Sequence, residues 1–313
     1  MFKKAFYFTM LLLVFGEPCL APKLEAGVDK KPLRIVCTIL PVYIFTLNVV
    51  GQVPDTEVKL LLPPRQGCPH NYDLTPGDLM VLSRADVIVA NGLGMDSFLE
   101  AFIRDQRPKV SLIEGAVKIV PLKEPSPPTR QHRVSGRKEH DHADEVNGHA
   151  WVSPEKAAIM VETIAEGLAR KDALHASEFR NNGRQYAERL RALAGEIKAV
   201  VARAGNRKIM AFHDILAYLA RDTGLTVVDI LEPQLGVEPS SRDMVRLIRT
   251  AKTQKIAAIF SEPPYSDKLV RAIAQEAGVP WYPFDPVATG RPAADTYETV
   301  MKKNIEILRK ALH

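Results

Sequence analysis

The sequence predicts an α/β protein of two lobes, each a parallel sheet covered by helices, joined by one long rigid helix. The chain has 313 residues, enough for two domains at roughly 150 residues each. Short apolar, β-branched runs alternate with longer helical patterns, which is typical of parallel sheets covered by helices. Between two such series lies a stretch, residues 153–203, that has no proline after Pro154 and is rich in helix-forming residues.

The first series predicts one βαβ domain. Its apolar runs indicate strands at residues 33–40, 58–62, 86–90 and 110–112. Helical patterns lie between them at residues 43–50, 75–83 and 95–104.

The second series predicts another domain of the same kind. Strands are expected at residues 208–212, 226–230, 256–260 and 280–284. The helices between them are expected at residues 215–222, 242–253 and 267–276.

The middle stretch is expected to link the two domains. Ser153 is a good N-cap with Pro154 at the first helical position, whereas Asn181-Asn182-Gly183 is a weak point in the helical pattern. The helix at 176–203 would run roughly 40 Å and act as a rigid spar. The predicted organisation is an N-terminal lobe at 32–175, a linker helix at 176–203 and a C-terminal lobe at 207–313.

The start of the chain predicts export. Two lysines precede the apolar run 5–15, which is too short to span a bilayer comfortably and is followed by small residues. Residues 1–26 are therefore interpreted as a signal peptide cleaved after Ala26. Lipid attachment at Cys19 is the alternative, which Glu17 and Pro18 disfavour.

Charge and cysteine content narrow the class of protein further. Lys and Arg number 42 against 37 Asp and Glu, a small excess that does not indicate a nucleic-acid partner.

After cleavage only Cys37 and Cys68 remain, and adjacent parallel strands could bring them together as a disulfide in an exported protein. One buried thiol and one loop thiol is the equally favoured alternative.

Residues 123–147 interrupt the pattern with three prolines, many charges and few apolar side chains. Such a stretch predicts a mobile loop. It carries three histidines, His132, His140 and His142.

One glycine-containing segment imitates a nucleotide site. Gly92-Leu93-Gly94-Met95-Asp96-Ser97 follows a predicted strand, but Ser97 stands where a dinucleotide motif has its third glycine. A tight turn between strand and helix explains the two glycines equally well, so nucleotide binding is not favoured.

The remaining signal lies in the positions of four polar residues. His70, His213 and Asp285 each follow a predicted strand, and His149 precedes the helix that starts at Pro154. Ligands of open α/β sheets bind outside the carboxyl ends of strands, so two facing domains would bring these groups together. Three imidazoles and one carboxylate form a filled tetrahedral set that favours zinc. Because no position is left for a reactive water, binding is favoured over catalysis.

The segments around these residues resemble the metal-site segments of a known family, the periplasmic zinc-type metal-binding proteins of ABC importers, typified by ZnuA and TroA. The matching segments, in the same order and spacing, are Pro69-His70-Asn71-Tyr72-Asp73-Leu74-Thr75-Pro76, Gly148-His149-Ala150-Trp151-Val152-Ser153-Pro154, Phe212-His213-Asp214 and Asp285-Pro286. The resemblance implies two α/β lobes joined by one long helix, with the metal between them. It also implies that His70, His149, His213 and Asp285 are the ligands.

Two positions depart from the family pattern, and two others bear on the metal and its surroundings. Ser153 replaces the usual acidic residue and Gly148 the usual proline, and neither change removes a ligand. Manganese-preferring relatives tend to have Glu where this chain has His213, which favours zinc. Glu262 follows a predicted strand and is expected to accept a hydrogen bond from an imidazole, with direct ligation as the alternative.

The function that the resemblance implies is an exported receptor that captures Zn²⁺ and delivers it to an inner-membrane ABC permease, as a monomer and without catalysis. A manganese or iron receptor of the same type, a zinc hydrolase and a metal-stabilised adhesin are the competing hypotheses. His132, His140 and His142 resemble the histidine-bearing loop of zinc-type relatives. They are interpreted as a weak zinc collector or as a solvated loop.

Overall fold

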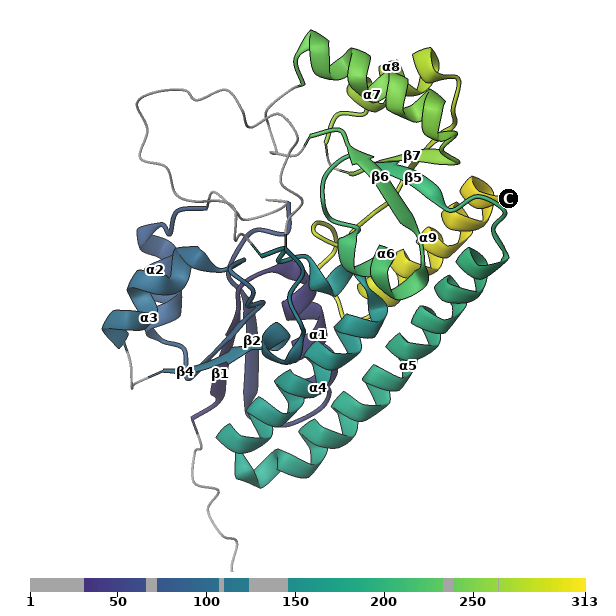
Figure 1. Ribbon diagram of the computed structural model, residues 1–313. Coiled ribbons are helices and arrows are strands. Elements are labelled where there is room, and N and C mark those ends of the chain that lie inside the picture. Colours follow the sequence, from purple (N-terminus) through teal and green to yellow (C-terminus); the bar gives the residue numbers. More distant parts are fainter. Residues whose placement is uncertain (1–30, 66–71, 107–109, 124–145, 233–238, 264) are drawn as a thin grey trace, which may run out of the picture. The chain divides into compact units, whose positions relative to one another are not determined.

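The computed structural model describes residues 31–65, 72–106, 110–123, 146–232, 239–263 and 265–313. Within these ranges Pro32–His313 is one compact unit, shown in Figure 1. In the described ranges no helix combines the length and apolar character that crossing a membrane requires. The predicted signal peptide, its cleavage after Ala26 and the alternative lipid site Cys19 lie outside the described residues.

The first sheet has four parallel strands in the order β2-β1-β3-β4. They are β1 (Leu33–Cys37), β2 (Thr56–Leu60), β3 (Val87–Ala90) and β4 (Ser111–Glu114). The central strand β3 is buried at every residue, whereas the edge strand β2 alternates between half-buried and exposed residues. This difference is expected because helices cover both faces of the middle of a parallel sheet.

Three helices accompany the first sheet: α1 (Leu40–Val50), α2 (Pro76–Ser83) and α3 (Glu100–Gln106). The predicted strand 33–40 is too long, because β1 ends at Cys37 and α1 begins at Leu40. Pro41 lies in the first turn of α1, where its fixed φ favours helix and its missing N–H leaves no bond unmade. The strand expected at 58–62 also lies two residues earlier.

The second sheet repeats this arrangement, with parallel strands in the order β6-β5-β7-β8. Its strands are β5 (Lys208–Ala211), β6 (Thr226–Ile230), β7 (Ala258–Ser261) and β8 (Trp281–Pro283). Its helices are α6 (Ala217–Thr223), α7 (Ser241–Gln254) and α8 (Lys268–Ala277). In this strand order the chain reverses direction across the sheet between β1 and β3 and between β5 and β7, which is where such sheets bind ligands.

Two long helices, α4 (Pro154–Lys171) and α5 (Ala176–Arg203), run side by side in Figure 1. Ser153 is the N-cap of α4, as predicted, and its side chain accepts a hydrogen bond from the backbone N–H of Lys156. The helix expected at 176–203 is confirmed, and the weak point at Asn181-Asn182-Gly183 does not interrupt it. A Cβ at Gly183 would lie 2.5 Å from the Cβ of Ala165, so the glycine allows α4 and α5 to approach closely.

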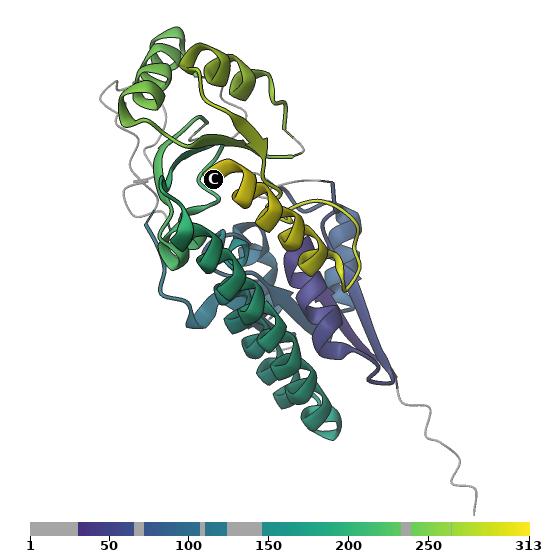
Figure 2. The same ribbon diagram turned by 90° about the vertical axis from the view of Figure 1, so that its right-hand side faces the viewer.

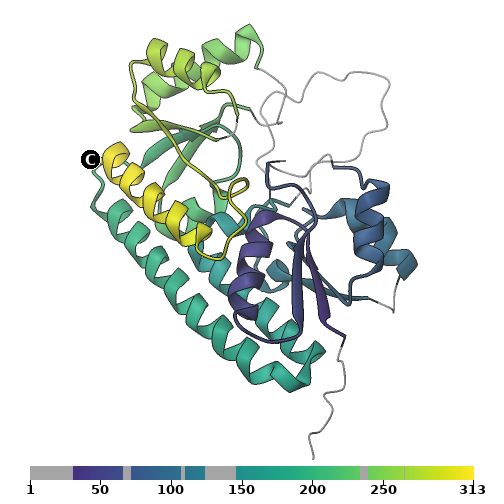
Figure 3. The ribbon, with the colours of Figure 1, turned by 180° about the vertical axis from the view of Figure 1, so that it is seen from behind.

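The C-terminal helix α9 (Thr296–Leu312) is an element that the sequence patterns did not predict. It runs alongside α5 in Figures 2 and 3, and Arg189 of α5 contacts Glu298 of α9 at 3.2 Å. Its buried residues include Tyr297, Met301, Ile305 and Leu308. This spacing of three and four residues is the helical signal that would have identified it.

The buried apolar side chains form two clusters. The larger cluster extends from the first sheet through α4 and α5 to one face of the second sheet. The smaller lies under α7 and α8 on the other face. Successive residues of β5 point to opposite faces, so Ile209 belongs to the larger cluster and Met210 to the smaller. Because the larger core is continuous across both sheets, the lobe boundaries 32–175, 176–203 and 207–313 stay predictions.

Candidate metal centre

His213 and Glu262 stand at the carboxyl ends of two neighbouring strands. His213 follows β5 after one residue, and Glu262 follows β7 directly. Nδ1 of His213 is 3.8 Å from Oε2 of Glu262, and the two side chains are 6% and 4% exposed. They therefore lie at the switch point of the second sheet. Glu262 lies beside an imidazole, and its role as the acceptor for that ring remains a prediction.

His149 approaches His213 from a different part of the chain. It precedes the short 3₁₀ helix η4 (Ala150–Val152) and is fully buried. The centroids of the His149 and His213 rings are 4.8 Å apart, and the rings are almost perpendicular. The structure thus brings two of the predicted ligands together.

Asn147 sets the orientation of the His149 ring. Its Nδ2 donates to the backbone oxygen of Asp214 at 2.6 Å and to Oδ2 of Asp214 at 3.0 Å. Its Oδ1 consequently faces His149, accepting from the backbone N–H at 2.9 Å and lying 3.2 Å from the ring Nδ1. Because an amide oxygen only accepts, Nδ1 must carry the hydrogen, and Nε2 keeps the lone pair that a metal ion needs.

The loop that follows β3 packs against the segment that carries His149. Asn91 donates from Nδ2 to the backbone oxygen of Gly148 at 2.9 Å. A Cβ at Gly148 would lie 2.7 Å from the terminal carbon of Met95 and 3.4 Å from the backbone oxygen of Leu93. Gly92, Leu93 and Gly94 all have positive φ. The tight turn expected for this glycine-containing segment is therefore confirmed, and it packs against the residue that precedes His149.

Asp285 lies beyond the end of β8 and is half-buried. Its Oδ1 accepts from the backbone N–H of Val287 at 2.8 Å, and Asn304 of α9 bonds to both its backbone N–H and its backbone oxygen. Burial raises the pKa of the Asp285 carboxyl, while the bond from Val287 acts against this shift. Asp285 is thus held in a fixed, partly desolvated position.

Two hydrogen bonds bring the Asp285 segment to the others. Nε1 of Trp151 donates to the backbone oxygen of Pro286 at 2.9 Å, which joins the His149 segment to the Asp285 segment. The backbone N–H of Gly290 donates to the backbone oxygen of Pro64 at 2.9 Å. Pro64, six residues before His70 in the sequence, thus lies beside the loop that follows Asp285.

The complete predicted ligand set is only partly visible. His70 lies outside the described residues, so its position is not tested. Among the described residues, no group of three or more His, Cys, Asp or Glu side chains is arranged to hold a metal ion. The structure places His149 beside His213 and connects their segments with that of Asp285, and the four-ligand set stays a prediction.

The histidine-bearing loop has a defined stem. Lys123 and Val146 pair as an isolated antiparallel bridge, and the backbone N–H of Asn147 donates to Leu122 at 2.8 Å. The bridge therefore marks the two ends of the histidine-bearing segment. Its second end, Val146, lies three residues before His149. His132, His140 and His142 lie outside the described residues.

The predicted disulfide is not supported. Cys37 is a free, fully buried thiol on the central strand β1, and burial raises its pKa to about 12. Its strand does pair with β2 as expected, with Cys37 opposite Leu60. Cys68 lies outside the described residues, and the buried-thiol hypothesis describes Cys37 as the structure has it.

A cavity of about 530 Å³ lies against β3, β4 and α3, with Asp96, Glu100, Arg104 and Glu114 among its lining residues. His149, His213 and Asp285 do not line it. This cavity is therefore separate from the histidine pair.

The comparisons with known proteins agree with the fold. The family model described as zinc-uptake complex component A, periplasmic, matches residues 35–311. The zinc-binding protein AdcA of Streptococcus pyogenes is 27% identical over 294 residues, covering 88% of this chain and 55% of that protein. This chain thus spans about half the length of that curated relative.

Two further relatives match over most of their length. The iron-binding protein YfeA of Yersinia pestis is 27% identical over 288 residues, covering 90% of this chain and 86% of that protein. The structure of the binding protein FpvC of Pseudomonas aeruginosa with Ni²⁺ is 31% identical, with a TM-score of 0.75, covering 90% of this chain and 97% of that chain. With the family model matched from β1 to α9, this chain belongs to the periplasmic zinc-uptake complex component A family of metal-binding proteins.

Proposed function

We propose that this chain is an exported receptor that captures a zinc ion between its two sheets and delivers it to an inner-membrane ABC permease. The observation that carries the proposal is the pair of buried imidazoles, His149 and His213, whose ring centroids are 4.8 Å apart with the rings almost perpendicular. Neutral imidazole is the commonest metal ligand among protein side chains, and zinc binds it readily. The tautomer that Asn147 imposes on His149 leaves the correct nitrogen for the metal.

The proposed ligands are His70, His149, His213 and Asp285. The bond between Trp151 and Pro286 joins the segments of His149 and Asp285. The bond between Gly290 and Pro64 holds a residue that precedes His70 in the sequence beside the loop after Asp285. Three nitrogens and one oxygen fill a tetrahedral site, which suits zinc as cargo and leaves no position for a reactive water. We propose that Glu262 accepts from the ring of His213 and that no reaction is catalysed.

Zinc titration of the metal-free mature chain, purified without a histidine tag, tests this assignment. Alanine at His70, His149, His213 or Asp285 is expected to lower zinc affinity at least a hundredfold, since each change removes a proposed donor. His175→Ala is the matched control, because His175 is also buried but bonds to Asp172 between α4 and α5. Unchanged affinity in the His149 and His213 variants would overturn the proposal.

A receptor for manganese or iron is the second candidate. Carboxylate oxygens, such as those of Asp285 and of Glu262 beside His213, are ligands that suit Mn²⁺ and Fe²⁺ as well. The relatives themselves are named for zinc and iron, and one was solved with nickel. Competition between zinc and manganese for the metal-free protein decides between these cargoes: tighter zinc binding supports the main proposal.

A zinc hydrolase and a metal-stabilised adhesin are tested separately. X-ray absorption that finds four protein ligands and no water would remove the zinc hydrolase. If the protein is an adhesin, deleting its gene would abolish cell adhesion and leave zinc uptake normal. Light scattering is expected to show a monomer, and no binding to nucleic acid is expected.

We propose that the histidine-bearing loop collects zinc beside the site. Its stem joins Lys123 to Val146, and Val146 is three residues before His149, so an ion held by His132, His140 or His142 would be released nearby. Deleting residues 124–145 is expected to keep the tight site and remove a weak second zinc in calorimetry. Loss of the tight site would contradict this role.

A further inference from the structure

One face of the short helix α6 carries three polar side chains that all contact the first half of the chain. Tyr218, Arg221 and Asp222 have the spacing i, i+3 and i+4, which places them on the same side of a helix. Tyr218 donates from its hydroxyl to the backbone oxygen of Asn147 at 2.9 Å and accepts from the backbone N–H of Leu122 at 3.1 Å. This face therefore fixes α6 against the stem of the histidine-bearing loop.

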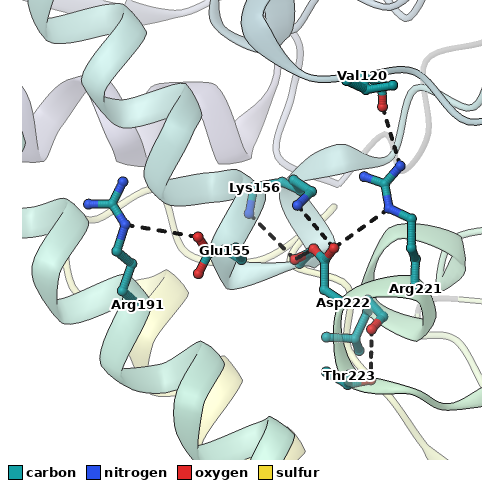
Figure 4. A network of polar contacts seen from close by, with 9 residues as sticks. Val120, Glu155, Lys156, Arg191, Arg221, Asp222 and Thr223 are labelled. Atoms are coloured by element: carbon teal, nitrogen blue, oxygen red, sulfur yellow. Dashed lines mark hydrogen bonds and ion pairs between the residues drawn. The ribbon is translucent and has the colours of Figure 1, made fainter.

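Asp222 makes the strongest of these connections. Its Oδ2 accepts from the hydroxyl of Ser153 at 2.6 Å, and its Oδ1 is 3.0 Å from Nζ of Lys156. Figure 4 shows this carboxylate between Lys156 and Arg221, whose Nε is 3.6 Å away. The Lys156 and Asp222 side chains are only 15% and 16% exposed, so water screens the ion pair weakly. The carboxylate also lies at the N-terminus of α4, where the helix dipole favours negative charge.

The connection joins the two segments that carry the histidine pair. Ser153 follows His149 by one short 3₁₀ helix, and α6 begins shortly after His213. The bond between Asn147 and Asp214 joins the same two segments on the other side of the pair. The segments of His149 and His213 are thus joined on both sides of the pair, by Asn147 with Asp214 and by Ser153 with Asp222. Neither connection needs a metal ion.

We propose that Asp222 is a positioning residue for the metal site, holding α6, and with it His213, against His149 before the metal arrives. The inference rests on the proposed function of the two histidines. When ligands are held in place in advance, binding loses less free energy to ordering them. Loosening the contact should therefore weaken metal binding without changing the donor atoms.

Ser153 gives this proposal a sharp test, because its hydroxyl is the group that donates to Asp222 at 2.6 Å. In Ser153→Asp the N-cap of α4 is kept, since Asp is as good a cap as Ser. The new carboxylate would face Asp222, and two like charges in contact repel. This variant breaks the contact with Asp222 and leaves the helix start intact.

The experiment compares the wild-type mature chain with Asp222→Asn, Ser153→Asp and the double variant. Each single change is expected to lower zinc affinity about tenfold, a typical loss when a residue that orients a metal ligand is changed. The double variant again pairs one carboxylate with one neutral partner and Lys156, and is expected to recover most of the affinity. The absorption spectrum of bound Co²⁺ is expected to stay the same in all four proteins.

Asp86→Asn is the matched control. It removes a two-bond ion pair with Arg34, at 3.0 and 3.1 Å, that lies in the first sheet and not on α6. It is expected to reduce thermal stability and to leave zinc affinity unchanged. If zinc affinity simply followed protein stability, Asp86→Asn would also bind zinc more weakly. That result would overturn the positioning role of Asp222.

The outcomes separate the two proposals. If His149→Ala and His213→Ala abolish zinc binding but both single variants bind zinc normally, only the role of Asp222 is overturned. If those alanine variants bind zinc normally, the proposed function fails. A double variant as weak as the single variants, or a changed Co²⁺ spectrum in Asp222→Asn, would also show that Asp222 does not act by position.

Discussion

The two sheets have the same strand order but differ in the polar residues at their switch points. Thr38 and Asn91 directly follow β1 and β3, whereas His213 follows β5 after one residue and Glu262 directly follows β7. All four residues are buried. Asn91 directs its amide to the backbone of Gly148 and so supports the segment of His149, while the ring of His213 itself contacts the ring of His149.

The two regions also differ in their carboxyl groups. Near the first switch point, Oδ2 of Asp96 accepts from the backbone N–H of Gly92 at 2.7 Å, and burial raises the pKa of Asp96 to about 6. At the second, Glu262 lies beside the imidazole of His213. One topology thus delivers buried polar groups to the same edge of both sheets. The first set supports a neighbouring segment, and the second presents groups that suit a metal ion.

Asp96→Asn is expected to have the largest effect on the first region. Because the pKa of Asp96 in the folded state lies above the ordinary aspartate value, the protonated form is favoured by folding, and this stability is lost as pH rises through about 6. Asparagine imitates the protonated form. The variant should therefore match the wild type near pH 4 and exceed its free energy of unfolding by about 3 kcal/mol at pH 7.5.

Urea unfolding of both metal-free proteins between pH 4 and 7.5 measures this difference. Asp86→Asn provides a control of opposite sign, because hydrogen bonds from Arg34 lower the pKa of Asp86. Its carboxylate stabilises the folded protein at neutral pH, and this contribution is lost as pH falls. A pH-independent difference between wild type and Asp96→Asn would contradict the prediction.

Asn91→Ala is expected to have the next largest effect. The change removes donors to the backbone oxygens of Gly148 and Gly92, at 2.9 and 2.8 Å, in a buried site. The expected loss is about 2 kcal/mol of unfolding free energy, with a weaker zinc affinity because Gly148 adjoins His149. Asn48→Ala removes two similar bonds near the surface, to Ile44 and Ala294, and should cost less. Equal losses in the two variants would argue against a supporting role for Asn91.

Local sequence patterns predicted the elements well because apolar spacing reports directly on burial. The eight strands of the described ranges lie within or close to the predicted runs, and the second sheet shows the helices expected between its strands. The errors have local causes, such as Pro41 starting α1 early. The strand-end positions of His213, Asp285 and Glu262 were also predictable from these runs.

The supporting contacts of the site were not predictable in the same way. Asn147 was assigned to the loop, yet it bonds to Asp214, which is 67 residues away in the chain. Ser153 was identified as a helix cap, and its bond to Asp222 spans 69 residues. Such contacts depend on how two distant segments pack, and no periodicity reports on that. A polar residue two places before a candidate ligand is the signal that would have drawn attention to Asn147.

Glu262→Gln is expected to have the smallest effect and tests the second region. If Glu262 accepts from the ring of His213, the carboxylate strengthens that imidazole as a donor, and an uncharged amide of the same shape should lower zinc affinity about tenfold, or about 1.4 kcal/mol. The Co²⁺ spectrum should stay unchanged, since no ligand is lost; an altered spectrum would instead identify Glu262 as a direct oxygen ligand. Thr38→Val, at the corresponding edge of the first sheet, should leave zinc affinity as it is. A comparable loss in both variants would show that the two switch points do not differ in the way inferred from their residues.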